Sequence, residues 1–296
     1  MTRQSWMTLL LVVLAWTSCA AMPVTVLYTN DVHLRWNRFA SMAEIIATER
    51  ESETHVLLFD AGDTWQDHRQ WIQNVWGSSE AIAWMNAVSY DAMAVGNHDA
   101  YLGSKRLLQL VSRAEFPVLS ANWRPMSDRT SMTKASMIVH IEDVAILVVG
   151  LTTPEFLPIP AYPDWQYHDP VDVLRDQLQH HASDVDFVFV VGHVSINHAR
   201  LIARQVPEID LFISGHSHER TTQPVYEGTT VIVQSGAFGQ TVGRLKLDLD
   251  TASDEMKLLT NDLLATEKTP VDVRAGVRHL VTVIAVIACA IAVWVL

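Results

Sequence analysis

Cysteine is almost absent from this chain, which has only two in 296 residues. They are Cys19 and Cys289, one near each end, so the region between them has no disulfide and no thiolate ligand for a metal. Clusters of lysine and arginine are also lacking, and the formal net charge is −12. A surface for a nucleic acid polymer needs a basic stripe, so we expect no such partner.

Long apolar runs are scarce as well, and the two that exist lie at the ends. Residues 1–21 have a positive start at Arg3, an apolar stretch and small residues up to Ala21. This pattern indicates a cleaved secretory signal peptide, with an uncleaved anchor as the alternative. Residues 280–296 form an uncharged C-terminal tail at the short limit of a membrane span. We expect either a transmembrane anchor or a GPI signal there, and hence an exported, membrane-associated protein with an extracellular or periplasmic domain.

Between these ends, apolar β-rich runs alternate with helical patterns. Helices are predicted over residues 38–50, 79–88, 104–113, 171–179 and 196–205. Strands are predicted over residues 24–28, 56–59, 92–95, 118–121, 138–141, 145–151, 187–191, 211–214, 230–234 and 244–249. The alternation predicts an α/β fold with largely parallel strands covered by helices. We expect one domain over residues 22–261, a polar linker over 262–279 and then the tail.

Five of the predicted strands end in residues that bind hard or borderline metals. These residues are Asp31, His33, Asp63, Asn97, His193, His216 and His218. Most of these motifs, taken singly, are explained equally well by a turn. Open α/β sheets bind ligands beyond the carboxyl ends of their strands, so the series as a whole favours one site for two metal ions.

Several longer motifs carry a resemblance to a known family. They are Asp60-Ala61-Gly62-Asp63-Thr64, residues 90–98, residues 116–122, residues 150–155 and Gly243-Arg244-Leu245. In these motifs, over roughly residues 23–250, the chain resembles the catalytic domain of the 5′-nucleotidase branch of the calcineurin-like metallophosphoesterases. The resemblance implies layered β-sheets flanked by helices in a single catalytic domain.

The resemblance also implies a division of labour among the site residues. One ion would take Asp31, His33 and His218, the other would take Asn97, His193 and His216, and Asp63 would bridge them. Such a ligand set suits Mn, Zn, Fe or Mg. Two ions held this way can carry a bridging hydroxide that attacks a phosphoryl group. His98, with Asp99 beside it, would be the catalytic pair, and the expected substrate contacts are Asn97, His98 and Asn122.

The chain departs from the family pattern at three positions. Tyr101 stands where an aspartate commonly orients the catalytic histidine, Asp67 replaces a usual glycine, and Ser195 replaces another. Typical members also have a second domain whose aromatic residues hold the nucleobase, and residues 262–296 do not match it. The tryptophans at 36, 65, 71 and 76 could form a substitute stacking surface or could simply pack in the core.

We therefore expect a dinuclear hydrolase of phosphomonoesters, with 5′-nucleotides as the expected small phosphorylated substrates. A phosphodiesterase or pyrophosphatase acting on nucleotide-sugars or other diesters is the alternative within enzymology. A metal-binding surface protein of low activity is the alternative outside it, motivated by Tyr101 and by the unmatched second domain.

Overall fold

The computed structural model describes residues 21–67, 69, 71–126 and 133–269. The expected signal peptide, apart from Ala21, and the whole expected C-terminal tail lie outside these residues, so both stay predictions. Within the described part of the chain, no helix combines the length and the apolar character needed to cross a membrane.

Two six-stranded sheets form the centre of the fold. The first sheet has the order β14 (Glu255–Ala265), β13 (Thr241–Asp250), β1 (Met22–Thr29), β2 (Val56–Asp60), β3 (Ala92–Ala94) and β4 (Val118–Leu119). Strands β1 to β4 run parallel, whereas β13 and β14 are antiparallel additions at one edge. The predicted parallel strands thus form most of this sheet, and the antiparallel pair lies at one edge.

The second sheet also has a parallel centre, but it has an antiparallel strand at each edge. Its order is β11 (Val225–Glu227), β12 (Thr230–Val233), β10 (Leu211–Ser214), β9 (Phe187–His193), β7 (Val144–Thr152) and β6 (Ser136–Ile141). The edge strands β6 and β11 are the antiparallel ones. A separate two-stranded sheet joins β5 (Trp123–Pro125) to β8 (Trp165–Tyr167).

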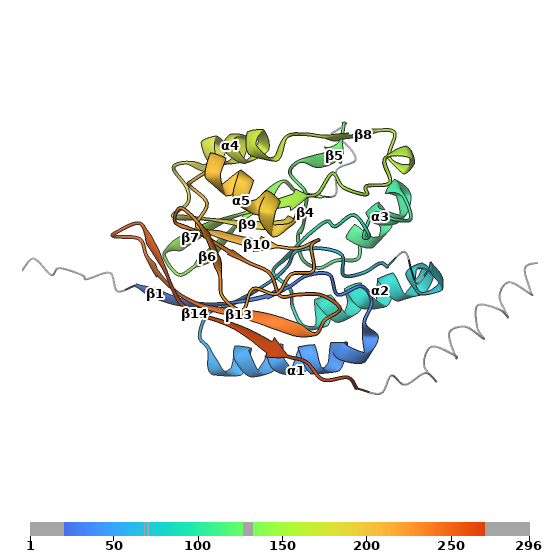
Figure 1. The fold of residues 1–296 in the computed structure, drawn as a ribbon, viewed down its shortest axis with the longest axis horizontal. Coiled ribbons are helices and arrows are strands. Elements are labelled where there is room, and N and C mark those ends of the chain that lie inside the picture. The colour runs from blue at the N-terminus through green and yellow to red at the C-terminus, as the bar shows by residue number, and fades with distance from the viewer. Residues whose placement is uncertain (1–20, 68, 70, 127–132, 270–296) are drawn as a thin grey trace, which may run out of the picture.

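Helices cover the outer faces of the stacked sheets, as Figure 1 shows. The first sheet packs against α1 (Trp36–Ser52), α2 (Trp71–Ala87) and α3 (Ser104–Val111). The second packs against α4 (Pro170–His181) and α5 (Ile196–Gln205), and a short 3-10 turn, η3 (Ile159–Ala161), precedes β8. The expected layered α/β fold is therefore confirmed.

Strand alternation explains why the central strands are apolar on both sides. Val26 and Tyr28 of β1 face the core between the sheets, where they join Phe189 of β9, while Leu27 faces the helices. Successive side chains of a strand point to opposite faces, so a strand with a sheet on one side and helices on the other is buried on both.

The predicted start of the linker, residue 262, is too early, because strand β14 continues to Ala265. Residues 262–265 belong to β14, which pairs with β13 over its whole length. Beyond the strand, Thr266 accepts hydrogen bonds from Arg38, and the Thr269 backbone N–H donates to Asn37 O at 2.7 Å. Strand β14 escaped prediction because it is a half-exposed edge strand without a clear apolar alternation.

The structure shows where two of the four tryptophans at 36, 65, 71 and 76 lie. Trp65 is fully buried, and Trp36 packs against Phe39 at the edge of the core beneath α1. Both therefore pack in or against the core and neither forms a free stacking surface. The side chains of Trp71 and Trp76 lie outside what the structure describes.

Candidate metal centre

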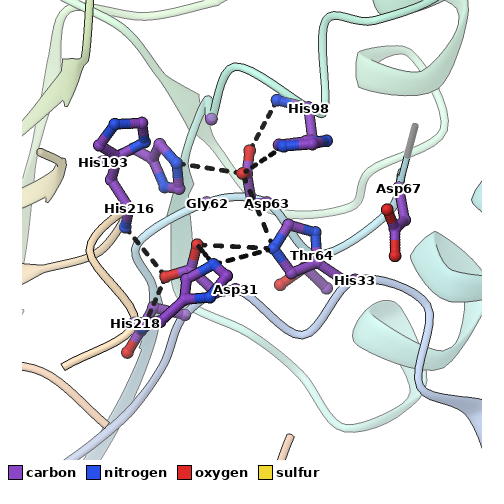
Figure 2. A network of polar contacts seen from close by, with 12 residues as sticks. Asp31, His33, Gly62, Asp63, Thr64, Asp67, His98, His193, His216 and His218 are labelled. Carbon is purple, nitrogen blue, oxygen red and sulfur yellow. Dashed lines mark hydrogen bonds and ion pairs between the residues drawn. The ribbon is translucent and has the colours of Figure 1, made fainter. Parts of the chain in front are cut away.

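The carboxyl ends of strands from both sheets meet at one edge, and the predicted ligands gather there (Figure 2). The first sheet supplies Asp31, His33, Asp63 and Asn97 from the segments after β1, β2 and β3; the second supplies His193 at the end of β9 and His216 and His218 after β10. All seven predicted ligands therefore lie in one cluster.

Asp63 lies at the centre of this cluster. Its Oδ2 is 3.2 Å from His193 Nε2, 3.9 Å from His98 Nε2 and 4.0 Å from His33 Nε2. The close approach of its loop depends on Gly96, because a Cβ there would lie 2.1 Å from Asp63 Oδ1. The carboxylate is thus placed between histidines from both sheets, as a bridging ligand requires.

The ligand atoms expected for the first ion converge closely. His218 Nε2 lies 3.2 Å from Asp31 Oδ1 and 3.3 Å from His33 Nε2. All three ligand atoms lie within 4.8 Å of one another, and so do those of Asp31, Asp63 and His193. Asp31 is therefore close to both halves of the cluster.

The hydrogen bonds of two histidines show which ring nitrogen faces the cluster. His193 Nδ1 lies 2.7 Å from Ala61 O, and a carbonyl only accepts, so Nδ1 donates and Nε2 is the nitrogen that points toward Asp63. His216 Nε2 likewise donates to the Glu155 carboxylate at 3.0 Å. Its Nδ1 then faces Asn97 Oδ1 at 3.1 Å. Partners that hold the outer nitrogen are typical of metal-binding histidines.

The polar atoms of the cluster fit a cation. Asp31 Oδ1 and His193 Nε2 are buried and make no hydrogen bond, although His218 Nε2 and Asp63 Oδ2 each lie 3.2 Å from one of them. His216 Nδ1 and Asn97 Oδ1 are both acceptors when the imidazole is neutral, yet they face each other. Buried acceptors that point at one another are costly unless something positive lies between them. The residues present therefore suit divalent metal ions.

Proton affinities around Asp63 reflect the same excess of negative charge. Burial would lower the pKa of His193, but the Asp63 carboxylate outweighs it and raises that pKa to about 10. Burial works against ionisation of Asp63 too, and the neighbouring histidines nevertheless hold its pKa well below the usual range. A metal ion bound here would take the place of these protons.

Backbone strain is concentrated at the cluster. Five of the predicted ligands have positive φ, namely Asp31, His33, Asp63, His216 and His218, with values from 51° to 70°. Residues other than glycine adopt this conformation at a cost, and such strain typically collects where function demands it. The strain turns side chains of successive loop residues toward one point.

His98 and Asp99 differ in what they contact. The His98 backbone N–H donates to Asp63 Oδ1 at 2.8 Å, and its ring stands edge-on to His33 at the mouth of the cluster. The Asp99 carboxylate is buried and accepts backbone N–H groups from Asp63, Trp65 and Gly96. These contacts support a role for Asp99 in holding the Asp63 loop rather than in moving protons.

Asn122 is not available to a substrate, which corrects the expected contact. Its side chain is fully buried, and both of its amide groups pair with the backbone of Thr152 at 2.8 Å. Asn122 instead ties the end of β7 to the segment after β4. The motif that contains it resembles the family for a structural reason.

Two of the three departures from the family pattern, Ser195 and Asp67, have local explanations. Ser195 accepts the His198 backbone N–H and so caps α5. Asp67 is buried, binds Arg69 at 2.8 Å and lies within 4.8 Å of the ring nitrogens of His33 and His98. Tyr101 is about half exposed. The family pattern has an aspartate at position 101 that orients the His98 ring, and this chain has Tyr101 there. Asp67 supplies a different carboxylate close to the same ring.

Glu155 contacts a predicted metal ligand, His216, and was not predicted from the sequence as a site residue. It follows β7, a parallel strand with its carboxyl end at the same edge, and it holds His216 through Nε2. The strand-end signal that identified the ligands applies here too. We overlooked it because β7 is followed by Thr152 and Thr153, which are weak metal ligands.

Comparison with known proteins agrees with this site. The sequence profile of calcineurin-like phosphoesterases matches residues 24–220. A snake venom 5′-nucleotidase from Crotalus adamanteus is 30% identical over 92% of this chain and 54% of its own length. A 5′-nucleotidase from Homo sapiens is 29% identical over 87% of this chain and 52% of its own. The chain thus spans about half the length of the curated relatives it matches.

Solved structures share the fold. A Haemophilus influenzae NAD nucleotidase superposes with a TM-score of 0.75 at 19% identity, covering 83% of this chain and 51% of the other. A Bacillus subtilis calcineurin-like phosphoesterase gives 0.70 at 20% identity, covering 84% and 94%. The resemblance to the 5′-nucleotidase branch is confirmed by the curated 5′-nucleotidase relatives, whereas the solved structures show the shared fold. With the profile matching residues 24–220, the chain belongs to the calcineurin-like phosphoesterase family.

Proposed function

We propose that this chain hydrolyses phosphomonoesters, with 5′-nucleotides as the substrate class, at a site that holds two divalent metal ions. The observation that carries the proposal is the meeting of six predicted ligands around a seventh, Asp63. Two of their buried atoms, Asp31 Oδ1 and His193 Nε2, make no hydrogen bond. The names of the 5′-nucleotide-hydrolysing relatives support the choice of substrate.

The proposed roles follow from the positions of the side chains. Asp31, His33 and His218 would hold one ion, Asn97, His193 and His216 the other, and Asp63 both. Metal ions bound there would activate water and neutralise the phosphoryl oxygens. His98, beside Asp63 at the mouth, would donate a hydrogen bond to a phosphoryl oxygen and a proton to the leaving oxygen. The sequence of residues 1–21 supports an exported protein.

A substrate panel with the purified full chain tests this proposal. Nucleoside 5′-monophosphates, p-nitrophenyl phosphate, UDP-sugars and simple diesters are each supplied with Mn or Zn. We expect turnover of the monoesters to exceed that of the diesters and to vanish in Asp63→Asn, with the distant Asp91→Asn as a matched control. Preference for diesters would favour the phosphodiesterase alternative, and no turnover at all would favour a binding protein.

A further inference from the structure

A cavity of about 260 Å³ is lined in part by Phe238, whose ring borders the predicted metal ligands His33 and His218. Its lining residues are Arg35, Asn37, Arg38, Phe238, Gln240 and Lys268. Three of the six carry positive charge, although the chain as a whole has a net charge of −12. A local concentration of cations in an acidic protein indicates an anionic ligand.

Phe238 forms the wall that this cavity shares with the metal centre. Its ring lies 5.2 Å from the His218 ring and 5.6 Å from the His33 ring, measured between centroids. Its backbone N–H donates to Asp31 O at 2.7 Å, so the loop that carries it is fixed to a metal-ligand segment. A ligand on the metals could therefore extend past Phe238 into the cavity.

The cations around Phe238 are held in place. The Arg35 guanidinium lies 4.8 Å from the centroid of the Phe238 ring and the Arg69 guanidinium 5.2 Å. Both arginines also pair with the buried Asp67, at 3.6 Å and 2.8 Å. The unusual aspartate at position 67 thus anchors two positive charges at the edge of the site, which reduces the entropy lost when an anion binds.

The segment after β14 completes the cavity. Arg38 donates two hydrogen bonds of 2.7 Å to Thr266, and the Glu267 backbone N–H donates to Ser41 Oγ at 3.0 Å. These bonds fasten the segment to α1. They place Lys268, an exposed residue, in the lining of the cavity.

We propose that this cavity binds a second anionic group of the substrate, next to the phosphoryl group on the metals. The substrate class would then include compounds with two adjacent phosphates, such as nucleoside diphosphates, in addition to monophosphates. The inference rests on the proposed phosphoesterase function of the neighbouring centre. Its recognition chemistry is the charge-assisted hydrogen bonding of phosphate by guanidinium and ammonium groups.

Two probes that are not hydrolysed separate the cavity from the metals. Methylphosphonate offers one phosphonate group, and methylenediphosphonate offers two; binding of each to the metal-loaded full chain is measured by calorimetry. We expect Lys268→Gln and Arg35→Gln each to weaken binding of the diphosphonate about 5–10-fold, the order of one screened charge-assisted bond, and to leave methylphosphonate within about twofold. The control, Lys257→Gln, removes an exposed cation on β14 away from the cavity.

Two other outcomes of the calorimetry would contradict the proposed anion site. An unchanged diphosphonate affinity in both variants, or an equal loss for both probes, would overturn the proposal, because the cavity would then make no contact with the second group. Hydrolysis of p-nitrophenyl phosphate by the same preparations reports the proposed function separately. A selective loss of diphosphonate binding without such hydrolysis would keep the anion site and reject the phosphoesterase role.

Discussion

The floor and the rim of the metal centre are built differently. Asp31, Asp63 and His193 form the floor, with at most 2% of their side chains exposed, and are held by backbone groups at strand ends. His98, His216 and His218 form the rim, with 19%, 13% and 37% of their side chains exposed. His216 depends on Glu155 for its orientation, and Glu155 is itself 57% exposed. The floor is buried with the core, and the rim faces solvent.

The largest expected effect is on turnover, from a substitution at the rim that should leave metal binding unchanged. His98→Ala should lower turnover of p-nitrophenyl phosphate about 10²–10⁴-fold, the usual contribution of a general acid. The metal content per chain, measured by mass spectrometry, should stay at the wild-type value, because His98 is not a predicted ligand. Loss of metal from this variant would assign His98 to the floor instead.

A floor substitution should affect metal, activity and stability together. The new Cβ of Gly96→Ala would meet Asp63 Oδ1 at 2.1 Å and Asp63 N at 2.5 Å, so the loop must move. We expect activity to fall about 10²-fold from misplacement of the site and the free energy of unfolding to fall by about 1–3 kcal/mol from overpacking.

Gly228→Ala is the matched control for that substitution. Gly228 has positive φ, unlike Gly96, and a Cβ there would meet nothing within 4 Å. It should lose only about 1–2 kcal/mol of stability from its backbone conformation and keep full activity. Equal activity of the Gly96 and Gly228 variants would show that the floor tolerates movement and would remove the contrast with the rim.

Glu155 offers an intermediate case, a rim residue that acts through a ligand. Glu155→Ala should weaken metal binding about 10–100-fold, as loss of a partner behind a ligating histidine does. Glu155→Gln keeps an acceptor for His216 Nε2 and should retain most of the affinity. Titration of the apo-protein with Zn measures both.

The control for Glu155 is Glu142→Ala, which removes another exposed carboxylate that pairs with a histidine, His55, at 3.4 Å. It should leave metal affinity unchanged. If Glu155→Gln were as damaging as Glu155→Ala, charge rather than orientation would be the contribution of Glu155.

The smallest effect concerns a buried carboxylate outside both regions. Burial raises the pKa of Asp210 from 3.8 to about 6, partly offset by the hydrogen bond from Val188 N–H and supported by the charge of Asp254. The folded state therefore holds the proton more tightly than the unfolded state. The stability contribution of Asp210 is fully present below about pH 4 and is lost as the pH rises to about 6.

Asp210→Asn removes this titration and keeps an acceptor for Val188. The variant should match the wild type near pH 4 and gain relative stability up to pH 6, by at most about 3 kcal/mol, with no further change above. Urea denaturation at several pH values measures the difference. Parallel stability curves would mean that Asp210 titrates normally in the folded protein.

The sequence alone determined the chemistry of the floor and most of the fold. Strands that end in Asp, Asn or His could be recognised because burial on both faces makes central parallel strands continuously apolar, as in Val56–Phe59 and Phe187–Val191. Strand β14 was missed because an edge strand needs no such pattern, and the expected start of α2 was late because Gly77 interrupts its helical signal.

Only the tertiary structure decided which groups meet across the two sheets. No local sequence pattern predicts that the Asn122 side chain bonds the Thr152 backbone or that Glu155 orients His216. Nor does any pattern predict that Lys268 lines the cavity next to Phe238. Such pairings join segments distant in the chain, so they follow from packing rather than from spacing. Residue types thus determine what a strand end can bind, and the stacking of the sheets decides what it meets.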